Sequence, residues 1–152
     1  MSDHAVTALC VLSHDQILVA YQYNNNIKLL NHQYQVVSRY NLTAHPHDIC
    51  QITPSEVALA VNDDTTHEVQ FVSMHDLRMV MGTKLKFEHS GFGIARYRKD
   101  LYITSGTSGT ALDKYTISGT RLSKLYEDTT AGATGNITVD IYWFHLNSYK
   151  LY

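Results

Sequence analysis

Short apolar runs bounded by turn residues recur along this chain, and no segment keeps a helical period. The clearest series consists of ILVA at residues 17–20, VALA at 57–60 and LYIT at 101–104. These runs begin 40 and then 44 residues apart. Because they are apolar at consecutive positions, they predict β-strands that are covered on both faces by neighbouring sheets.

Three further strands are predicted around each of these runs, at matching positions. The strand before each run corresponds to residues 9–12, 49–52 and 94–97. The two strands after it correspond to residues 27–30, 69–72 and 112–115, and then to 35–38, 78–80 and 122–125. Four short strands in a unit of about 40–45 residues are the sequence signature of a β-propeller blade.

The predicted fold is therefore a single all-β domain over residues 1–152, an incomplete β-propeller of four-stranded antiparallel blades. The blades are expected at about 5–42, 47–88 and 90–127, with an incomplete fourth unit at 136–152. Closed propellers contain at least about four blades. The chain is thus expected to be a piece of a propeller, and its exposed lateral faces invite self-association.

The composition narrows the classes of partner. The 152 residues include 12 Lys and Arg against 14 Asp and Glu, which gives a formal net charge of −2. A charge this close to zero argues against general binding to nucleic acids or to acidic membranes. The N-terminus shows no secretory signal pattern, and no apolar stretch approaches the ~18 residues that suggest a membrane span. We therefore expect a cytoplasmic protein that does not bind membranes.

Cys10 and Cys50, the two cysteines, occupy equivalent positions in the first two units. Two cysteines are too few for the zinc modules of RING or B-box type. Their equivalent places in consecutive blades predict buried free thiols that act as small hydrophobic side chains.

Several segments resemble NHL repeats. Residues 24–31 (NNNIKLLN) resemble the N-x-R-I-x-V strand of these repeats, with Asn26 in place of the commoner Arg. Residues 46–50 (PHDIC) resemble the P-x-G-I-A strand that opens an NHL blade, with Asp48 in place of Gly. Later parts of the pattern are similar to segments 93–95, 100–104 and 114–119. Together, residues of about 5–128 resemble the six-bladed NHL-type propeller at the C-terminus of tripartite-motif (TRIM) proteins.

This resemblance implies a binding module without chemistry of its own. In TRIM-type ubiquitin ligases a RING domain carries the ligase activity, and the propeller binds substrate proteins or RNA. The expected function is therefore a non-catalytic scaffold that binds a protein partner, as a fragment of a longer protein and without a cofactor. Two alternatives stay open: a propeller enzyme of the lactonase or lyase type with a loop-bound metal, and an RNA-binding module of NHL type.

The candidate binding surface is formed by the loops between the second and third strands, which occupy equivalent places in the repeat. Such loops emerge on one face of a propeller and are held by a rigid scaffold. The candidate residues are Tyr23, Asn24, Asn25, Asp63, Asp64, His67, Ser105 and Thr107.

Other polar clusters favour ordinary loops and turns. Segment 45–48 (HPHD) has two imidazoles and a carboxylate, but it is expected in the loop that leads into the second blade. No third His or Cys has a metal-motif spacing to it, so we expect no metal site there. The acidic loop at 62–68 does not match an EF-hand, and no pair of carboxylates suggests acid–base catalysis. Basic and aromatic residues at 84–86 and 96–99 could contact RNA, but they fall where solvated charges are common.

Overall fold

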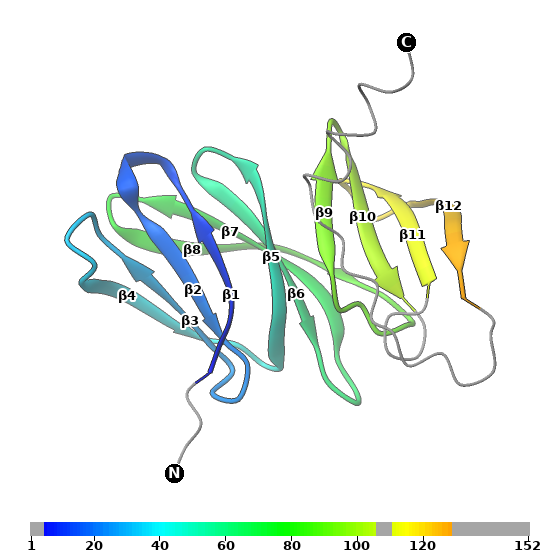
Figure 1. Ribbon diagram of the computed structural model, residues 1–152, viewed down its shortest axis with the longest axis horizontal. Coiled ribbons are helices and arrows are strands. Elements are labelled where there is room, and N and C mark those ends of the chain that lie inside the picture. The colour runs from blue at the N-terminus through cyan, green and yellow to red at the C-terminus, as the bar shows by residue number, and fades with distance from the viewer. Residues whose placement is uncertain (1–4, 106–110, 129–152) are drawn as a thin grey trace.

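The computed structural model describes residues 5–105 and 111–128, which form three four-stranded antiparallel sheets (Figure 1). In every sheet the strands are neighbours in chain order. The first sheet consists of β1 (Val6–Val11), β2 (Ile17–Tyr21), β3 (Asn26–Leu30) and β4 (Val36–Asn41). The second consists of β5 (His45–Thr53), β6 (Glu56–Asn62), β7 (His67–His75) and β8 (Arg78–Lys86). The third consists of β9 (Ile94–Tyr97), β10 (Asp100–Ser105), β11 (Ala111–Thr116) and β12 (Arg121–Glu127).

Each apolar run that predicts a strand overlaps one of these strands, in the expected order. The remaining regular element is a short 3-10 helix, η1 (Ser13–Asp15), in the connection between β1 and β2. The unit expected at 136–152 lies outside the described residues.

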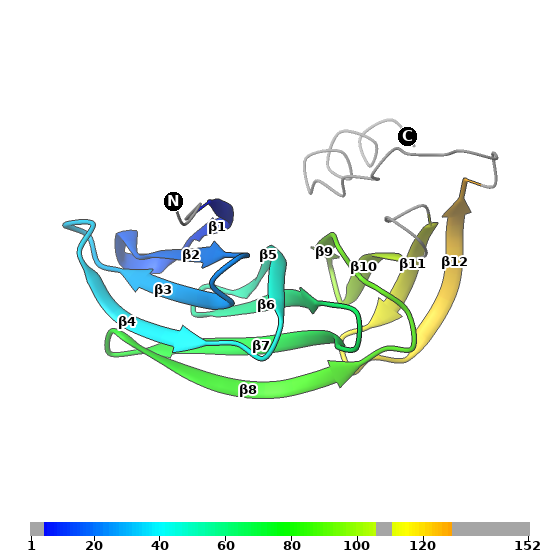
Figure 2. The same cartoon turned by 90° about the horizontal axis from the view of Figure 1, so that it is seen from below.

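The sheets stand side by side along an arc, with the first strand of each on its inner side. Figure 2 shows β1, β5 and β9 on this concave side, and β4, β8 and β12 on the convex side. Two contacts show that the sheets have the same orientation. The Thr7 hydroxyl donates to the Pro46 carbonyl at 3.2 Å, so β1 and β5 begin at the same end. The backbone N–H of Ile94 donates to Asp48 Oδ2 at 2.9 Å, so β9 begins there too.

Strand β6 explains how the sheets pack. Successive strand residues point to opposite faces of a sheet. On one face, Val57, Leu59 and Val61 join the core between the first and second sheets. On the other, Ala58 and Ala60 join the core between the second and third sheets. The expectation of strands covered on both faces is therefore confirmed for β6, which is buried from Val57 onwards.

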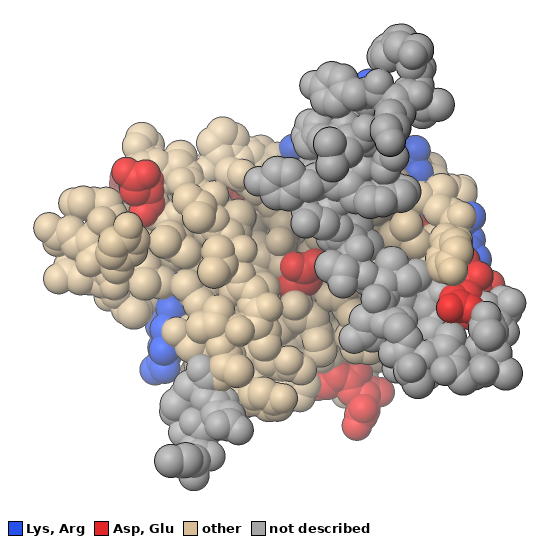
Figure 3. Space-filling view, in the orientation of Figure 1, with Lys and Arg blue, Asp and Glu red and all other residues tan. Residues whose placement is uncertain are grey.

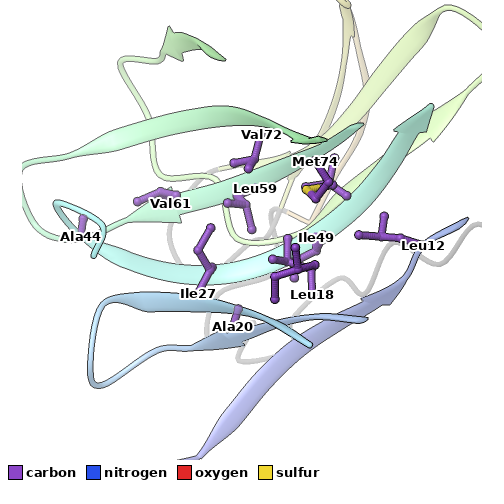
Figure 4. Close-up of a cluster of buried hydrophobic side chains, with 12 residues drawn as sticks. Leu12, Leu18, Ala20, Ile27, Ala44, Ile49, Leu59, Val61, Val72 and Met74 are labelled. Atoms are coloured by element: carbon purple, nitrogen blue, oxygen red, sulfur yellow. The ribbon is translucent and has the colours of Figure 1, made fainter. Parts of the chain in front are cut away.

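The two cores contain different side chains. Figure 4 shows the first core, in which Leu18 and Ile27 from the first sheet meet Ile49 and Leu59 from the second. The second core is centred on larger aliphatic and aromatic side chains around the two alanines of β6: Val69, Phe71, Ile94, Leu101, Ile103 and Tyr115. Small side chains on this face of β6 leave room for Phe71 and Tyr115.

The cysteines are both free thiols. Cys50 is buried as expected, and burial is the main reason why its pKa is raised to about 12. Cys10 differs from the expectation because it is only partly buried. It lies on β1, an edge strand that is hydrogen-bonded to β2 alone.

Segment 45–48 also differs from the expectation. It belongs to β5, which begins at His45, and is not a loop that leads into the second sheet. Pro46 fits there because the pairing of β5 with β6 shifts between Pro46 and Asp48, and proline is tolerated at such irregularities. The early start of β5 places His45 opposite Asn62, the last residue of β6.

Candidate functional site

The connections between the second and third strands lie at one end of the sheets, which we call the β6–β7 end. It is the lower edge of the molecule in Figure 1. Residues 22–25 join β2 to β3, and residues 63–66 join β6 to β7. Because the sheets share one orientation, these turns and the last residue of β10, Ser105, occupy the same end. Thr107 lies outside the described residues.

The β2–β3 turn carries the most exposed aromatic side chain at this end. Tyr23 is 67% exposed, while Asn24 and Asn25 are partly buried. Asn25 has a φ of 47°, in the left-handed region that asparagine tolerates better than most residues. Its side-chain oxygen contacts His45 Nδ1, which ties the turn to the start of the second sheet.

The β6–β7 turn is held by the Asp63 carboxylate. Asp63 Oδ1 accepts hydrogen bonds from the backbone N–H groups of Thr65 at 2.8 Å and Thr66 at 2.7 Å. These two bonds stabilise the ionised form, so the pKa of Asp63 is lowered. Asp64 is exposed beside it, and His67 starts the next strand. The turn therefore presents carboxylates on a fixed backbone.

Ser105 does not face solvent. It is 3% exposed, and its hydroxyl donates to Asp113 Oδ2 at 2.6 Å. Arg121 donates to the other carboxylate oxygen, Oδ1, at 2.8 Å. His89 Nε2 lies 3.9 Å from Asp113 Oδ2 and also contacts the Tyr115 hydroxyl. Ser105 thus belongs to a buried polar network inside the third sheet.

A hollow of about 390 Å³ opens at the β6–β7 end, where the start of β5 and the β6–β7 turn meet the connection between β8 and β9. Its lining residues are His45, His47, Asn62, Asp63, Asp64, His67, Ser90 and Phe92. Three of the candidate residues, Asp63, Asp64 and His67, therefore line the same hollow. The structure adds the histidines of β5, because β5 begins earlier than expected.

Asn62, Ser90 and Phe92 are lining residues that the sequence did not indicate. Asn62 is the last residue of an apolar strand, and the other two lie in the connection between β8 and β9. That connection carries no repeat signal. The only sequence hint was the dense pattern of polar residues at 45–48 and 62–68.

Each histidine of the hollow is fixed by one ring nitrogen. His45 Nδ1 lies 3.1 Å from the Gln22 carbonyl oxygen, and His47 Nε2 lies 3.1 Å from the Asn62 carbonyl oxygen. His67 Nδ1 contacts Asn62 Oδ1. Oxygens of this type only accept, so these ring nitrogens carry the hydrogen. Burial lowers the pKa of His47, which favours its neutral form; the Asn62 carbonyl opposes this shift and nearby His45 adds to it.

These side chains do not form a metal centre. Among residues 5–105 and 111–128, no group of three or more His, Cys, Asp or Glu side chains is arranged to hold a metal ion. The ring centroids of His45 and His47 are 6.5 Å apart and stand nearly perpendicular. Phe92 packs edge-on against His47 at 5.1 Å, so an aromatic wall lines one side of the hollow.

No protein-family model matches the sequence, and no curated protein matches it. Solved structures do match the fold. Virginiamycin B lyase from Staphylococcus aureus matches with a TM-score of 0.66 and 14% identity, over 87% of this chain and 44% of the lyase. The WD40 repeats of RRP9 match with a TM-score of 0.64 and 12% identity, over 86% of this chain and 41% of RRP9. The chain is an incomplete β-propeller.

The similar structures include both enzymes and scaffolds. Glutaminyl cyclase from Myxococcus xanthus matches with a TM-score of 0.63 and 11% identity, over 80% of this chain and half of the enzyme. This chain spans half or less of these solved structures. At such identities the likeness shows the propeller fold alone, and the NHL and TRIM assignment stays a prediction. No helix in the described part of the chain is long and apolar enough to cross a membrane.

Proposed function

We propose that this propeller is a non-catalytic module that binds a protein partner at the β6–β7 end of its sheets. The supporting observation is a hollow of about 390 Å³, bordered by the β6–β7 turn, whose backbone is fixed by Asp63. The β2–β3 turn is tied to His45, a residue that lines the hollow, through Asn25. A preformed surface loses little conformational entropy on binding. The binding residues in this proposal are Tyr23, Asn24, Asn25, Asp63, Asp64 and His67, and also Thr107 as their neighbour in the repeat. Ser105, which the repeat also predicts, is left out because it is buried against Asp113.

The resemblance to NHL repeats gives this proposal a biological setting. In it, the chain acts as the substrate-recognition part of a TRIM-type ubiquitin ligase, in the cytoplasm. The two free thiols are in keeping with a reducing compartment. A propeller scaffold that binds protein has a precedent in BBS1N, solved in complex with ARL6DN and similar to this chain with a TM-score of 0.62.

Capture from a cell lysate tests the proposal. The immobilised full chain is compared with Tyr23→Asn, and bound proteins are quantified by mass spectrometry. The matched control is Tyr34→Asn, because Tyr34 is 72% exposed in the β3–β4 turn at the opposite end of the sheets. We expect the first substitution to reduce specific partners several-fold and the control to retain them. Equal retention by both variants would place binding elsewhere.

A propeller enzyme is the second candidate function. The lyase and the cyclase share this fold, and three histidines line the hollow. A ligand that binds only the folded state raises the melting temperature. Thermal unfolding with and without millimolar calcium or zinc separates the two candidate functions. A metal-binding enzyme predicts a higher melting temperature with the metal, whereas the non-catalytic binding module predicts no change.

RNA binding has less support than protein binding, because several of the basic residues that could contact RNA already have partners within the chain. Lys84 pairs with Glu68 at 3.3 Å, and the Arg96 guanidinium donates to the Ile52 carbonyl. Arg98 lies over the ring of Tyr97 at 5.2 Å. Binding to RNA would appear as an affinity that falls steeply with salt concentration.

We also propose that a second copy of the chain covers the open face of the first sheet. Strand pairing shows that Leu9, Ile49 and Ile94 are equivalent, since they lie opposite Val19, Leu59 and Ile103. Ile49 is 9% exposed and Ile94 is 2% exposed because each packs against the preceding sheet. Leu9 is 60% exposed, as is Val11.

The open face is a flank of the first sheet, next to the concave side. Figure 3 shows the concave side, on which the described residues in view include few Lys, Arg, Asp and Glu side chains. Apolar surface that is unpaired in one copy favours association. Two copies would also bring the number of described sheets from three to six.

A further inference from the structure

The hollow at the β6–β7 end is lined by groups that accept hydrogen bonds. His45 and His67 each use Nδ1 to donate, which leaves Nε2 as an acceptor in the neutral ring. His47 donates through Nε2, which leaves Nδ1 as an acceptor. Asp63 and Asp64 add two carboxylates, and no Lys or Arg is among the lining residues. The hollow is therefore complementary to a cation that donates several hydrogen bonds.

The kind of cation follows from two features of the hollow, the arrangement of its ligand-type side chains and its volume. No three of the described His, Cys, Asp and Glu side chains are placed to share one metal ion. The hollow, at about 390 Å³, falls within the roughly 300–1,000 Å³ typical of pockets for organic groups. A guanidinium carries five donors in one plane and can reach separated acceptors at once. It also packs well against aromatic rings such as Phe92 and His47.

Asn62 is a buried polar residue in the wall of the hollow. This residue is only 4% exposed and lines the hollow. Its carbonyl oxygen accepts from His47, and its Oδ1 accepts from His67. Both of its oxygen atoms are therefore engaged by histidines of the hollow, and its side-chain amide also carries N–H donors. An amide N–H in this position suits a carbonyl oxygen of a peptide backbone.

We propose that the hollow binds the side chain of an arginine in the partner protein. The guanidinium lies among the free nitrogens of His45, His47 and His67, next to the carboxylates of the β6–β7 turn. Asn62 Nδ2 donates to a neighbouring backbone carbonyl of the partner. This inference rests on the proposed function and names the chemistry that the partner must supply.

NMR titration of the full chain at pH 8 with N-acetyl-arginine N-methylamide tests the proposal. We expect saturable changes in the ring resonances of His45, His47 and His67, and none at the exposed His14 and His32. N-acetyl-citrulline N-methylamide has the same shape without the charge and should give no saturable change. A response to citrulline equal to that of arginine, or no saturable response, would overturn the proposal.

Paired charge variants place the site. The double variant Asp63→Asn with Asp64→Asn removes two charges from the turn, while asparagine can still accept the backbone hydrogen bonds of residue 63. We expect arginine binding to weaken about tenfold, as for two surface ion pairs. The matched control is Asp15→Asn with Asp76→Asn, two exposed turn residues at the opposite end with φ of 56° and 48°. It should leave binding unchanged, and equal weakening would contradict the proposed site.

Failure of the arginine proposal and failure of the proposed protein-binding function give different results. If Tyr23→Asn reduces the capture of partners from the lysate but the arginine derivative gives no saturable response, the hollow does not bind arginine. The proposed protein-binding function is then still supported. If arginine binds but no partner is captured through Tyr23, the proposed protein-binding role fails instead.

Discussion

At the scale of single residues, Asp113 shows how a buried charge is accommodated. The residue is 2% exposed, and burial alone would raise the pKa of its carboxyl group. The hydrogen bonds from Ser105 and Arg121, with the charges of Arg121 and His89, outweigh burial and lower this pKa. The carboxylate therefore stabilises the folded state in its ionised form.

Asp113→Asn should lower the free energy of unfolding by about 2 kcal/mol at pH 7, because it weakens charged hydrogen bonds in a buried place. The difference in free energy of unfolding between the two proteins should decrease as the pH falls. A carboxyl whose folded pKa is lowered contributes fully above its unfolded pKa of about 3.9, and the contribution vanishes as pH falls through the folded pKa. Urea unfolding of both proteins between pH 3 and 7 measures this difference.

The difference should be constant above about pH 5 and shrink below about pH 4. Asp76→Asn is the control, since Asp76 is exposed and its substitution should change the free energy by less than about 0.5 kcal/mol. A difference that grows as the solution becomes more acidic would contradict the role assigned to Asp113.

At the scale of the strand, β6 joins two cores through its two faces. Leu59 faces the first core and is fully buried, whereas Ala58 faces the second and is also fully buried. Neighbours in sequence are thus held by different sheets. A change at either position should disturb one inter-sheet contact and leave the other in place.

Leu59→Ala should lower the free energy of unfolding by about 2–5 kcal/mol, because it leaves a cavity between the first two sheets. Ala58→Leu should lower the free energy of unfolding by about 1–3 kcal/mol, because the second core has no room for the added atoms. Gln51→Ala, at an exposed position of β5, is the control and should have almost no effect. Urea unfolding measures all three, and a cost below 1 kcal/mol for Leu59→Ala would show that the sheets are loosely packed.

The strands were predictable because their signal is local. Apolar residues such as those at 57–60 must be covered on both faces, and this requirement is visible in the sequence itself. The hollow was only partly predictable. Asp63, Asp64 and His67 follow from the repeat, but Phe92 and Ser90 come from a connection without periodicity. Ser105 looked like a loop residue, and its burial depends on the distant partner Asp113.

At the scale of the whole molecule, no sheet among the described residues precedes the first sheet, whereas the second and third sheets each pack against the sheet before them. The equivalents of Leu9 in the second and third sheets are buried by the sheet before them, while Leu9 is 60% exposed. Its side chain points away from the core that Ala8 and Cys10 join on the other face of β1. We expect a second copy to cover it, since two-fold dimers are the commonest assemblies of identical chains.

Leu9→Lys should abolish this association without unfolding the chain. A lysine at the centre of an apolar contact leaves a charge without a partner, whereas at an exposed strand position its effect on folding is small. Light scattering across a range of protein concentrations should give about twice the chain mass for the natural sequence and the chain mass for the variant. Val80→Lys is the control, because Val80 is 49% exposed on β8 of the second sheet and should not affect the mass. A natural sequence that stays monomeric at all concentrations would contradict the second copy and leave the open face to another partner.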